Sequence, residues 1–479
     1  MKRFLFVLIL SFIYSNSTLL AEIKIHSDSS SVIKGIWQGT LKVQGMELRL
    51  VFKINEEENG KFKATLDSPD QGAKDIPVDS VIYSDGILKL ISNAIRGYFE
   101  GTYIADSIAF EGKWHQSGMS FALIIKKVDK IEEVKRPQEP KPPFPYRVED
   151  VIYENRIAGI KLGGTLTLPE SGVPFPAVLL ITGSGAQNRD EELFGHKPFM
   201  VIADYLTRHG IAVLRVDDRG IGESTGNFSA STTKDFATDV LSGVEYLKSR
   251  KEINPKEIGL IGHSEGGIIA PMVATETNNV AFIVLMAGTG IPGDQVLLTQ
   301  TEAIEKLNGA SEEKIKEDLE LNKKIYDVLK EDKDSSAIAH KLYKIYTDSY
   351  NKLSSDKKAE IGDPKIAFER GIKTVMSPWF RYFVKYNPYP ILEKVKCPVL
   401  ALNGSKDVQV LPSINLPAIK NALEEGGNKN FEVKELPGLN HLFQTANTGA
   451  PSEYGKIEET ISPIALQTIG NWILKIVKK

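Results

Sequence analysis

The first quarter of the chain alternates apolar and polar residues in short runs that are separated by turns. In MELRLVFKI, for example, apolar residues mostly alternate with Glu47, Arg49 and Lys53. This period of two is typical of a half-buried antiparallel strand. Seven or eight such runs lie between residues 35 and 128, so we expect a small antiparallel β barrel or sandwich domain over residues 30–130.

A proline-rich segment, residues 131–146, follows this pattern. It contains RPQEPKPPFPY, with five prolines from Pro137 to Pro145. Proline has no N–H donor and a fixed backbone angle, so it interrupts helices and β ladders alike. We therefore expect a stiff, extended linker here, and with it the clearest domain boundary in the chain.

From residue 147 to residue 479, continuous apolar runs alternate with amphipathic helical patterns. After a hairpin pattern, VEDVIYEN and GIKLGGTLTLP, the apolar runs are FPAVLLITG, IAVLRVDD, EIGLIGHS, VAFIVLMAG and CPVLALNG. Runs without alternation predict strands that are covered on both faces, as in a parallel sheet flanked by helices. Charged helical sequence interrupts this order between about residues 290 and 387. Because it falls between two strands of an α/β domain, this insert is a candidate helical lid.

The N-terminal sequence MKRFLFVLILSFIYSNSTLLAEIK has two cations, a short apolar run and then small and polar residues up to Ala21. This pattern predicts a signal peptide over residues 1–21, because the run is too short for a permanent membrane span. A retained anchor is the alternative. We expect export to the periplasm or the medium, with no stable membrane span in the mature chain.

The composition bears on disulfide bonds and on nucleic-acid binding. Cys397 is the only cysteine, so no intramolecular disulfide can form and packed cores must hold the fold together. The formal net charge of −3 is small for 479 residues. It gives no sign of a nucleic-acid partner.

The pentapeptide GHSEG, residues 262–266, lies where an apolar run ends and a helical pattern begins. A serine between two glycines in this context matches the nucleophile elbow, a sharp turn from strand to helix. We expect that a side chain at Gly262 or Gly266 would collide with neighbouring backbone. The turn would present the Ser264 hydroxyl beside the helix N-terminus, where the amide of Glu265 can meet an oxyanion. The alternative is that Ser264 is only a small residue in a tight turn.

A serine nucleophile needs a base and an acid that orients the base, in the chain order serine, acid, histidine. Only His340 and His441 follow Ser264. His340 lies in the charged insert, whereas His441 lies in a turn after the run FEVKELP, so His441 is the candidate base. Asp407, just after the run CPVLALNG, is the candidate acid, with Asp294 as the fallback.

Two loops near this elbow have functional and structural interpretations. In LLITGSGAQNRDEE, glycines let the backbone approach a substrate, so we assign the second oxyanion donor to the amide of Ser184, with Gly185 as the near alternative. An ordinary glycine turn is the other interpretation. In VDDRGIGES, Asp217, Asp218 and Arg219 could form a metal or substrate site, but an internal ion pair that braces the loops is favoured. No histidine and carboxylate cluster has the spacing of a metal site.

These motifs, with GLNHLFQ and LALNGSKDVQV, make residues 147–479 resemble the α/β-hydrolase superfamily. More narrowly, the chain resembles bacterial carboxylesterases of the EstD type, whose catalytic domains are similar to those of serine aminopeptidases. The resemblance implies Ser264 as nucleophile, His441 as general base and acid, and Asp407 as its orienting residue. It also implies hydrolysis of short-chain esters through an acyl-enzyme, with no cofactor. The long insert departs from the compact pattern of these esterases, which puts acyl-length preference in doubt.

Two other hypotheses compete with a carboxylesterase. A serine aminopeptidase or dipeptidyl-peptidase-like enzyme would bind a free amine through acids near the site, and Glu265, Asp190, Glu191 and Glu192 are the candidates. Alternatively, the β domain binds an envelope component and the hydrolase domain is a scaffold without activity. The motifs specify a fold and a triad but not a substrate.

Overall fold

The computed structural model describes residues 30–477 apart from 44–45, 59, 72, 117–118, 132–134, 332–333, 356–357, 359–360 and 362, so the expected signal peptide lies outside the described residues. The chain forms two compact units. The first contains the chain up to Lys135 together with Leu193–Gly195 and Lys352–Gly371, and the second contains Arg136–Glu192, His196–Asn351 and Ile372–Lys479. No helix within the described part of the chain is long and apolar enough to cross a membrane.

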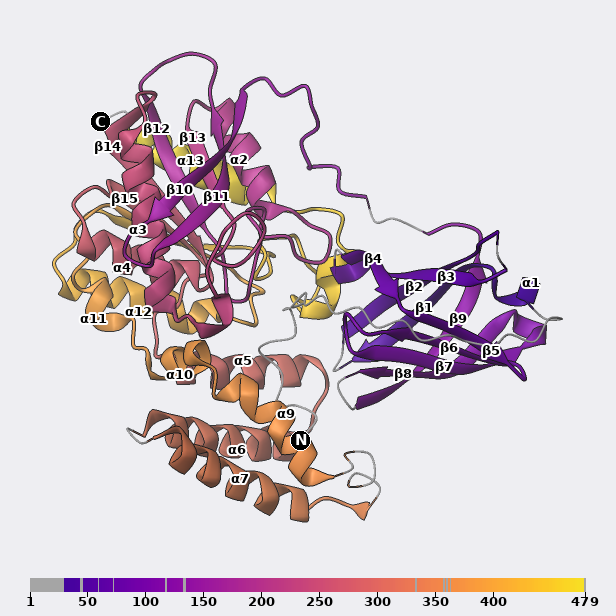
Figure 1. Ribbon diagram of the computed structural model, residues 1–479. Coiled ribbons are helices and arrows are strands. Elements are labelled where there is room, and N and C mark those ends of the chain that lie inside the picture. Colours follow the sequence, from indigo (N-terminus) through magenta and orange to yellow (C-terminus); the bar gives the residue numbers. More distant parts are fainter. Residues whose placement is uncertain are drawn as a thin grey trace. The chain divides into compact units, whose positions relative to one another are not determined.

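The first unit is built on one antiparallel sheet in the order β4-β3-β2-β1-β9-β8-β7-β6-β5 (Figure 1). A short helix, α1 (Ser30–Ile33), precedes it. The strands are β1 (Gly35–Val43), β2 (Met46–Glu56), β3 (Phe62–Ser68), β4 (Ala73–Val78), β5 (Ser80–Ser84), β6 (Ile87–Ser92), β7 (Gly97–Ile104), β8 (Ala109–Gln116) and β9 (Met119–Val128). The sheet has nine strands, where the sequence pattern predicts seven or eight.

This sheet curls around a core of aromatic and aliphatic side chains. The ring centroids of Phe52 on β2 and Phe99 on β7 are 6.0 Å apart, although three strands separate β2 from β7 in the sheet. In a flat sheet with strands about 4.8 Å apart, that separation would be about 19 Å. Trp37 and Trp114 fill the same cluster and are almost fully buried. The alternating residues of β2 therefore face an interior packed with side chains.

The second unit contains a mixed sheet in the order β10-β11-β13-β12-β14-β15-β16-β17, in which only β11 runs antiparallel to both neighbours. Its strands are β10 (Arg147–Asn155), β11 (Ile160–Leu168), β12 (Phe175–Ile181), β13 (Ala212–Val216), β14 (Ile253–His263), β15 (Phe282–Met286), β16 (Val399–Gly404) and β17 (Phe431–Leu436). Every residue of β15 and β16 is buried. The continuous apolar runs are explained by helices on both faces of the sheet.

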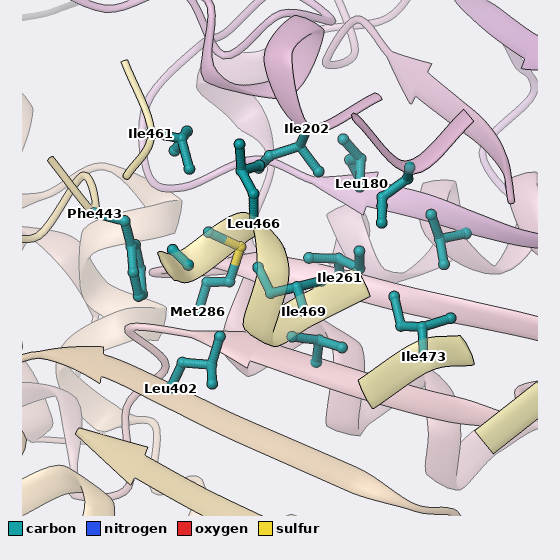
Figure 2. Close-up of a cluster of buried hydrophobic side chains, with 14 of the residues drawn as sticks. Leu180, Ile202, Ile261, Met286, Leu402, Phe443, Ile461, Leu466, Ile469 and Ile473 are labelled. Carbon is teal, nitrogen blue, oxygen red and sulfur yellow. The ribbon is translucent and has the colours of Figure 1, made fainter. Parts of the chain in front are cut away.

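Two helices, α2 (Pro198–Arg208) and α13 (Pro463–Val477), cover one face of this sheet. Figure 2 shows Leu466, Ile469 and Ile473 of α13 packed against side chains of the central strands, such as Ile261. Truncating a buried isoleucine or leucine of this kind to alanine costs about 2–5 kcal/mol. The helices α3 (Thr233–Ser249), α4 (Gly266–Glu276) and α12 (Pro412–Glu425) also pack on the sheet.

A helical insert separates β15 from β16, as the charged sequence predicts. It contains α5 (Gly293–Leu307), α6 (Glu312–Lys330), α7 (Ser335–Asn351), α9 (Pro364–Val375) and α10 (Pro378–Lys385), and α11 (Tyr389–Leu392) follows. Helix α10 carries a Ser377 cap at its N-terminus and buries Trp379, Phe380 and Phe383. It packs against α3 and α5 of the same unit. Helix α10 therefore joins the insert to α3, one of the helices that pack on the sheet.

The proline-rich segment is attached to the second unit from Arg136 onward. The guanidinium of Arg136 donates to the main-chain oxygens of Ile457, at 2.9 Å, and Gly455, at 3.0 Å. The side-chain amide of Gln138 donates to the oxygen of Ile461 at 2.7 Å. These bonds hold the start of the segment against the loop before α13.

Candidate active site

The turn between β14 and α4 has the geometry of a nucleophile elbow. Ser264 has a φ of +53°, a left-handed conformation that is uncommon for residues other than glycine. A Cβ at Gly262 would overlap the main-chain oxygen of Gly266, and one at Gly266 would overlap that of Ile181. The amide of Ser264 donates to the oxygen of Met286 on β15 at 2.8 Å. The strain and the close packing fix Ser264 at the carboxyl end of the central strand.

His441 and Asp407 are hydrogen-bonded to each other in the loops after β17 and β16. The distance from His441 Nδ1 to Asp407 Oδ2 is 2.8 Å, and both side chains are buried. The other oxygen of Asp407 accepts from the amides of Gln409 and Val410, at 2.8 and 2.9 Å. These bonds hold the carboxylate still, so it can fix the ring orientation of His441 and place the hydrogen on Nδ1.

The alternatives considered from the sequence lie elsewhere. Asp294 is in the first turn of α5 and accepts a hydrogen bond from Lys330 Nζ at 2.7 Å. His340 is exposed on α7. The ring of His441 instead lies 4.9 Å, between centroids, from the ring of His263, the residue before Ser264. The structure thus brings His441, with Asp407, to the elbow.

Two main-chain amides near Ser264 are available to an oxyanion. Within the described residues, the N–H groups of Glu265 and Ser184 have no hydrogen-bond acceptor, and Ser184 is exposed. The preceding amide, that of Gly183, is occupied, because it donates to Glu191 Oε1 at 2.7 Å. A Cβ at Gly183 would lie 3.3 Å from the Cβ of Ser264, so this loop runs directly beside the serine.

The Asp217, Asp218 and Arg219 segment braces the loops of the site. Asp217 accepts from the amide and guanidinium of Arg189, and Asp218 accepts from the amide of Gln187 at 2.9 Å. Arg219 pairs with Asp239 of α3 at 2.7 Å. These bonds join the segment to other elements, and its two acids hold the loop that carries Ser184. Burial raises the pKa of Asp218 well above its ordinary value.

Glu265 is buried directly after the nucleophile position. Its Oε1 accepts from Thr233 Oγ1 and from Trp379 Nε1, each at 2.7 Å. Burial raises the pKa of Glu265 to about 7, although both hydrogen bonds favour the ionised form. Trp379 belongs to α10, so this bond ties the helical insert to the elbow. No sequence pattern indicated the contact, because residues 265 and 379 are remote in the chain.

The acids considered for binding an amine are engaged in the structure. Asp190 forms an ion pair with the buried Arg215, and Glu192 accepts from Asn188 Nδ2 at 3.2 Å. Glu191 is buried and accepts from Gly183 and from His263 Nδ1, the latter at 2.9 Å. His263 precedes Ser264 in the chain, so the order serine, acid, histidine does not point to it. The only available sign of its importance was its place beside Ser264.

The described residues contain no group of three or more histidine, cysteine or carboxylate side chains that could hold a metal ion.

The chain is similar in sequence to a known protein family and to a known esterase. A protein family described as "Serine aminopeptidase, S33" matches residues 197–357, a segment that includes the elbow and ends before Asp407. Esterase EstD of Thermotoga maritima is 26% identical over 315 residues, which cover 66% of this chain and 66% of that one. The alignment thus spans just under two thirds of either protein.

Solved structures of esterases are similar in part. An esterase of Pyrococcus furiosus, Pf2001, has 17% sequence identity and a TM-score of 0.41, covering 73% of this chain and 98% of its own. The enzyme Est1E of Butyrivibrio proteoclasticus with bound ferulic acid has 16% identity and a TM-score of 0.39, covering 69% and 100%. The strand order, the elbow and the matched family identify the second unit as an α/β-hydrolase fold.

Proposed function

We propose that the protein is an exported serine hydrolase that cleaves short-chain carboxylic esters, with Ser264, His441 and Asp407 as its catalytic triad. The observation that carries the proposal is the hydrogen bond of 2.8 Å between the buried His441 and Asp407, beside an elbow that holds Ser264 at φ +53°. The resemblance to Esterase EstD, whose name states an esterase, supports the ester class.

In the proposed mechanism, the oxygen of Ser264 attacks the ester carbonyl while His441 Nε2 takes the serine proton. Asp407 holds the other ring nitrogen and stabilises the imidazolium that forms. The negative charge moves to the carbonyl oxygen, which accepts hydrogen bonds from the amides of Glu265 and Ser184. The carbon–oxygen bond to the alcohol then breaks, and His441 returns its proton to the leaving oxygen. This leaves an acyl-enzyme on Ser264.

Water completes the cycle. His441 removes a proton from a water molecule, whose oxygen attacks the acyl carbonyl, and the same two amides stabilise the second tetrahedral intermediate. The bond to Ser264 breaks, the serine regains its proton from His441, and the carboxylic acid leaves. Each step uses groups of this chain and water alone.

The helical insert is proposed as a lid that forms a wall of the substrate site. The bond from Trp379 to Glu265 supports this role, because it anchors α10 beside the residue whose amide meets the oxyanion. A wall of buried aromatic side chains at this place would limit the length of the acyl group. Export is proposed from the sequence pattern of residues 1–21 alone. The N-terminal mass of protein secreted by the native host tests it.

An amide hydrolase is the second candidate, because the matched family is described as a serine aminopeptidase. The acids that would bind a free amine have partners inside the protein: Asp190 with Arg215, Glu191 with His263, and Glu265 with Trp379. This arrangement favours the ester over the peptide.

The test is a paired assay of the parent enzyme and Ser264→Ala on p-nitrophenyl esters from acetate to dodecanoate, with alanyl and dipeptidyl p-nitroanilides alongside. We expect serine-dependent turnover that is fastest on the short esters. Serine-dependent turnover confined to the anilides would establish the peptidase instead. Equal turnover by the two proteins would contradict both.

A further inference from the structure

His263, the residue before the proposed nucleophile, makes two buried hydrogen bonds that the mechanism above does not use. Its Nδ1 lies 2.9 Å from Glu191 Oε1, and its Nε2 lies 2.9 Å from the main-chain oxygen of His441. Both side chains are buried, at 6% exposure for His263 and 3% for Glu191. One side chain therefore joins the elbow, the loop that carries Ser184 and the turn that carries His441.

The partners of the His263 ring determine where its hydrogens lie. A main-chain carbonyl can only accept, so Nε2 carries a hydrogen. An ionised Glu191 also only accepts, and its Oε1 already receives the amide of Gly183, so Nδ1 donates as well. Both ring nitrogens of His263 then carry hydrogens, and the charge of the imidazolium is balanced by the carboxylate of Glu191.

The electrostatic surroundings favour this protonated form. Burial alone lowers the pKa of His263, but the charge and hydrogen bond of Glu191 and the bond to the His441 carbonyl outweigh it, and the pKa is raised. The charge of Asp407 acts in the same direction. Glu191 is hydrogen-bonded to the His263 ring, and the ring of His441 lies 4.9 Å from it between centroids.

The loop around Glu191 also holds its side chain in place. Glu191 has a φ of +50°, and its amide donates to the oxygen of Asn188 at 2.9 Å, so the loop turns sharply to aim the carboxylate inward. A Cβ at Gly183 would lie only 3.4 Å from Glu191 Oε1. Glu191 thus occupies the amide of Gly183, whereas the next amide in the chain, that of Ser184, has no acceptor among the described residues.

We propose that Glu191 and His263 form a positioning pair that sets the base and the second oxyanion donor of the reaction against Ser264. The inference rests on the proposed serine hydrolase function. Asp407 sets the orientation of the His441 ring, whereas His263 sets the position of the His441 main chain. Glu191 sets the direction of the Ser184 amide. Neither member of the pair touches the substrate.

A small displacement of such groups lowers the rate strongly, since misplacement by about 1 Å can lower it by about a hundredfold. The loss should fall on kcat, because the pair orders groups that act in the transition state. We therefore expect Glu191→Gln and His263→Asn each to lower kcat by about 10- to 100-fold while KM stays within about threefold.

The Glu191→Gln variant preserves the size of the side chain and removes its charge. A neutral His263 has only one ring hydrogen, so when Nε2 donates to the His441 carbonyl its Nδ1 can only accept. Residue 191 must then turn its NH2 group toward the ring, and the carboxylate oxygen that receives both Nδ1 and the amide of Gly183 is lost. Glu170→Gln is the control for the acid change, because Glu170 is an exposed acid of the same unit. His209→Asn, on the exposed end of α2, is the control for the histidine change.

The experiment measures kcat and KM on a short p-nitrophenyl ester, with kcat expressed per active serine as titrated by a fluorophosphonate. Misfolded protein then drops out of the comparison. We expect the two pair variants to lose kcat per active serine and the two controls to keep the parent value. If both pair variants keep kcat per titrated serine within about twofold and lose only thermal stability, the pair is merely structural and the proposal is wrong.

A spectroscopic measurement tests the proton count in the parent protein itself, and the variants serve to assign the signals. In protein labelled with ¹⁵N-histidine, we expect two slowly exchanging ring N–H signals from His263. They should be absent in His263→Asn and reduced to one in Glu191→Gln. A single ring N–H in the parent would overturn the pairing on its own. Full activity of Ser264→Ala would instead defeat the proposed function while leaving this signal unchanged, so the two failures can be told apart.

Discussion

The curled sheet of the first unit and the mixed sheet of the second enclose different kinds of side chain. The interior of the first is a cluster of apolar residues in which Trp37, Phe52 and Trp114 are almost fully buried. Its buried carboxylates, Asp67 and Asp70, are paired with Lys53 and Arg49. The second unit also has an apolar core, between its sheet and the helices α2 and α13. At the carboxyl ends of its strands, however, it buries a group of ionisable residues.

That group is concentrated around one turn. Around Ser264, the described residues in it are Glu265, His263, Glu191, His441 and Asp407. Burying ionisable side chains costs free energy unless each has a partner, so proteins gather them where chemistry requires them. Both units therefore contain the packing that stabilises a fold, whereas the residues suited to chemistry are concentrated in the second.

The largest expected effect is on the proposed base. Replacing His441 with glutamine removes the group that takes the serine proton, so kcat should fall by about a millionfold. The matched control is His340→Gln, on the exposed face of α7, which should retain parent activity. Steady-state assays on p-nitrophenyl acetate measure both. Loss of activity in the control but not in His441→Gln would move the base to the insert.

A core substitution in the first unit should lower the stability of that unit and leave kcat unchanged. Phe52→Ala removes a ring that packs against Phe99 and Trp114, and should lower the free energy of unfolding of this unit by about 3–5 kcal/mol. Hydrogen exchange of peptides from residues 35–128 measures this loss. We expect kcat per titrated serine to stay at the parent value. A parallel fall in kcat while the unit stays folded would show that the β domain takes part in the chemistry.

Glu265 should make the stability of the second unit depend on pH. Its pKa in the folded protein, about 7, lies above its ordinary value of 4.5, so the folded state binds more protons between these pH values. Its contribution to stability is therefore fully present below about pH 4.5 and is lost as pH rises through about 7. The total change is about 3 kcal/mol.

Glu265→Gln should remove this dependence, because the amide stays neutral at every pH. Urea unfolding at pH 4.5, 6 and 8 measures it, with Glu276→Gln at the exposed end of the same helix as the control. The Glu265→Gln protein should gain stability relative to the parent at pH 8. Identical slopes for parent and variant would mean that Glu265 is ionised throughout.

The smallest effect is expected where the insert meets the elbow. Trp379→Phe keeps an aromatic ring but removes the hydrogen bond to Glu265, which is worth about 1 kcal/mol. We expect kcat/KM on long acyl chains, relative to short ones, to change by about fivefold, the factor that corresponds to about 1 kcal/mol. Trp472→Phe on α13, in the apolar core of the same unit, is the control and should leave the ratio unchanged. An unchanged ratio in Trp379→Phe would argue against the lid as a wall of the acyl site.

The features that could be predicted from the sequence are those that depend on residues adjacent in the chain. The alternation in β2, the continuous apolar runs of β15 and β16, and the strand–turn–helix context of Ser264 all follow from the environment of consecutive residues. The α/β fold class with a preceding antiparallel β domain was predicted in this way and is confirmed. The strand β4 has no clear alternating pattern, because AKDIPV mixes proline and charge into a short strand at the end of the strand order.

Contacts between remote segments could not be predicted. The bond between Trp379 and Glu265 joins residues that are 114 positions apart, and that between His263 and Glu191 joins residues 72 apart. In the sequence NRDEE, nothing distinguishes Glu191 from a solvent-exposed acid. In the structure its left-handed backbone conformation accompanies a buried side chain. Such partners are set by tertiary packing, which a local pattern does not encode.

The proposed function depends above all on which residue forms the covalent intermediate, and that residue can be identified directly. The parent protein and Ser264→Ala are treated with a fluorophosphonate, digested, and examined by mass spectrometry for the modified peptide. We predict one adduct, on Ser264, formed in proportion to the loss of esterase activity and absent from Ser264→Ala. Inactivation with the adduct on another residue, or with none on Ser264, would contradict the proposed mechanism.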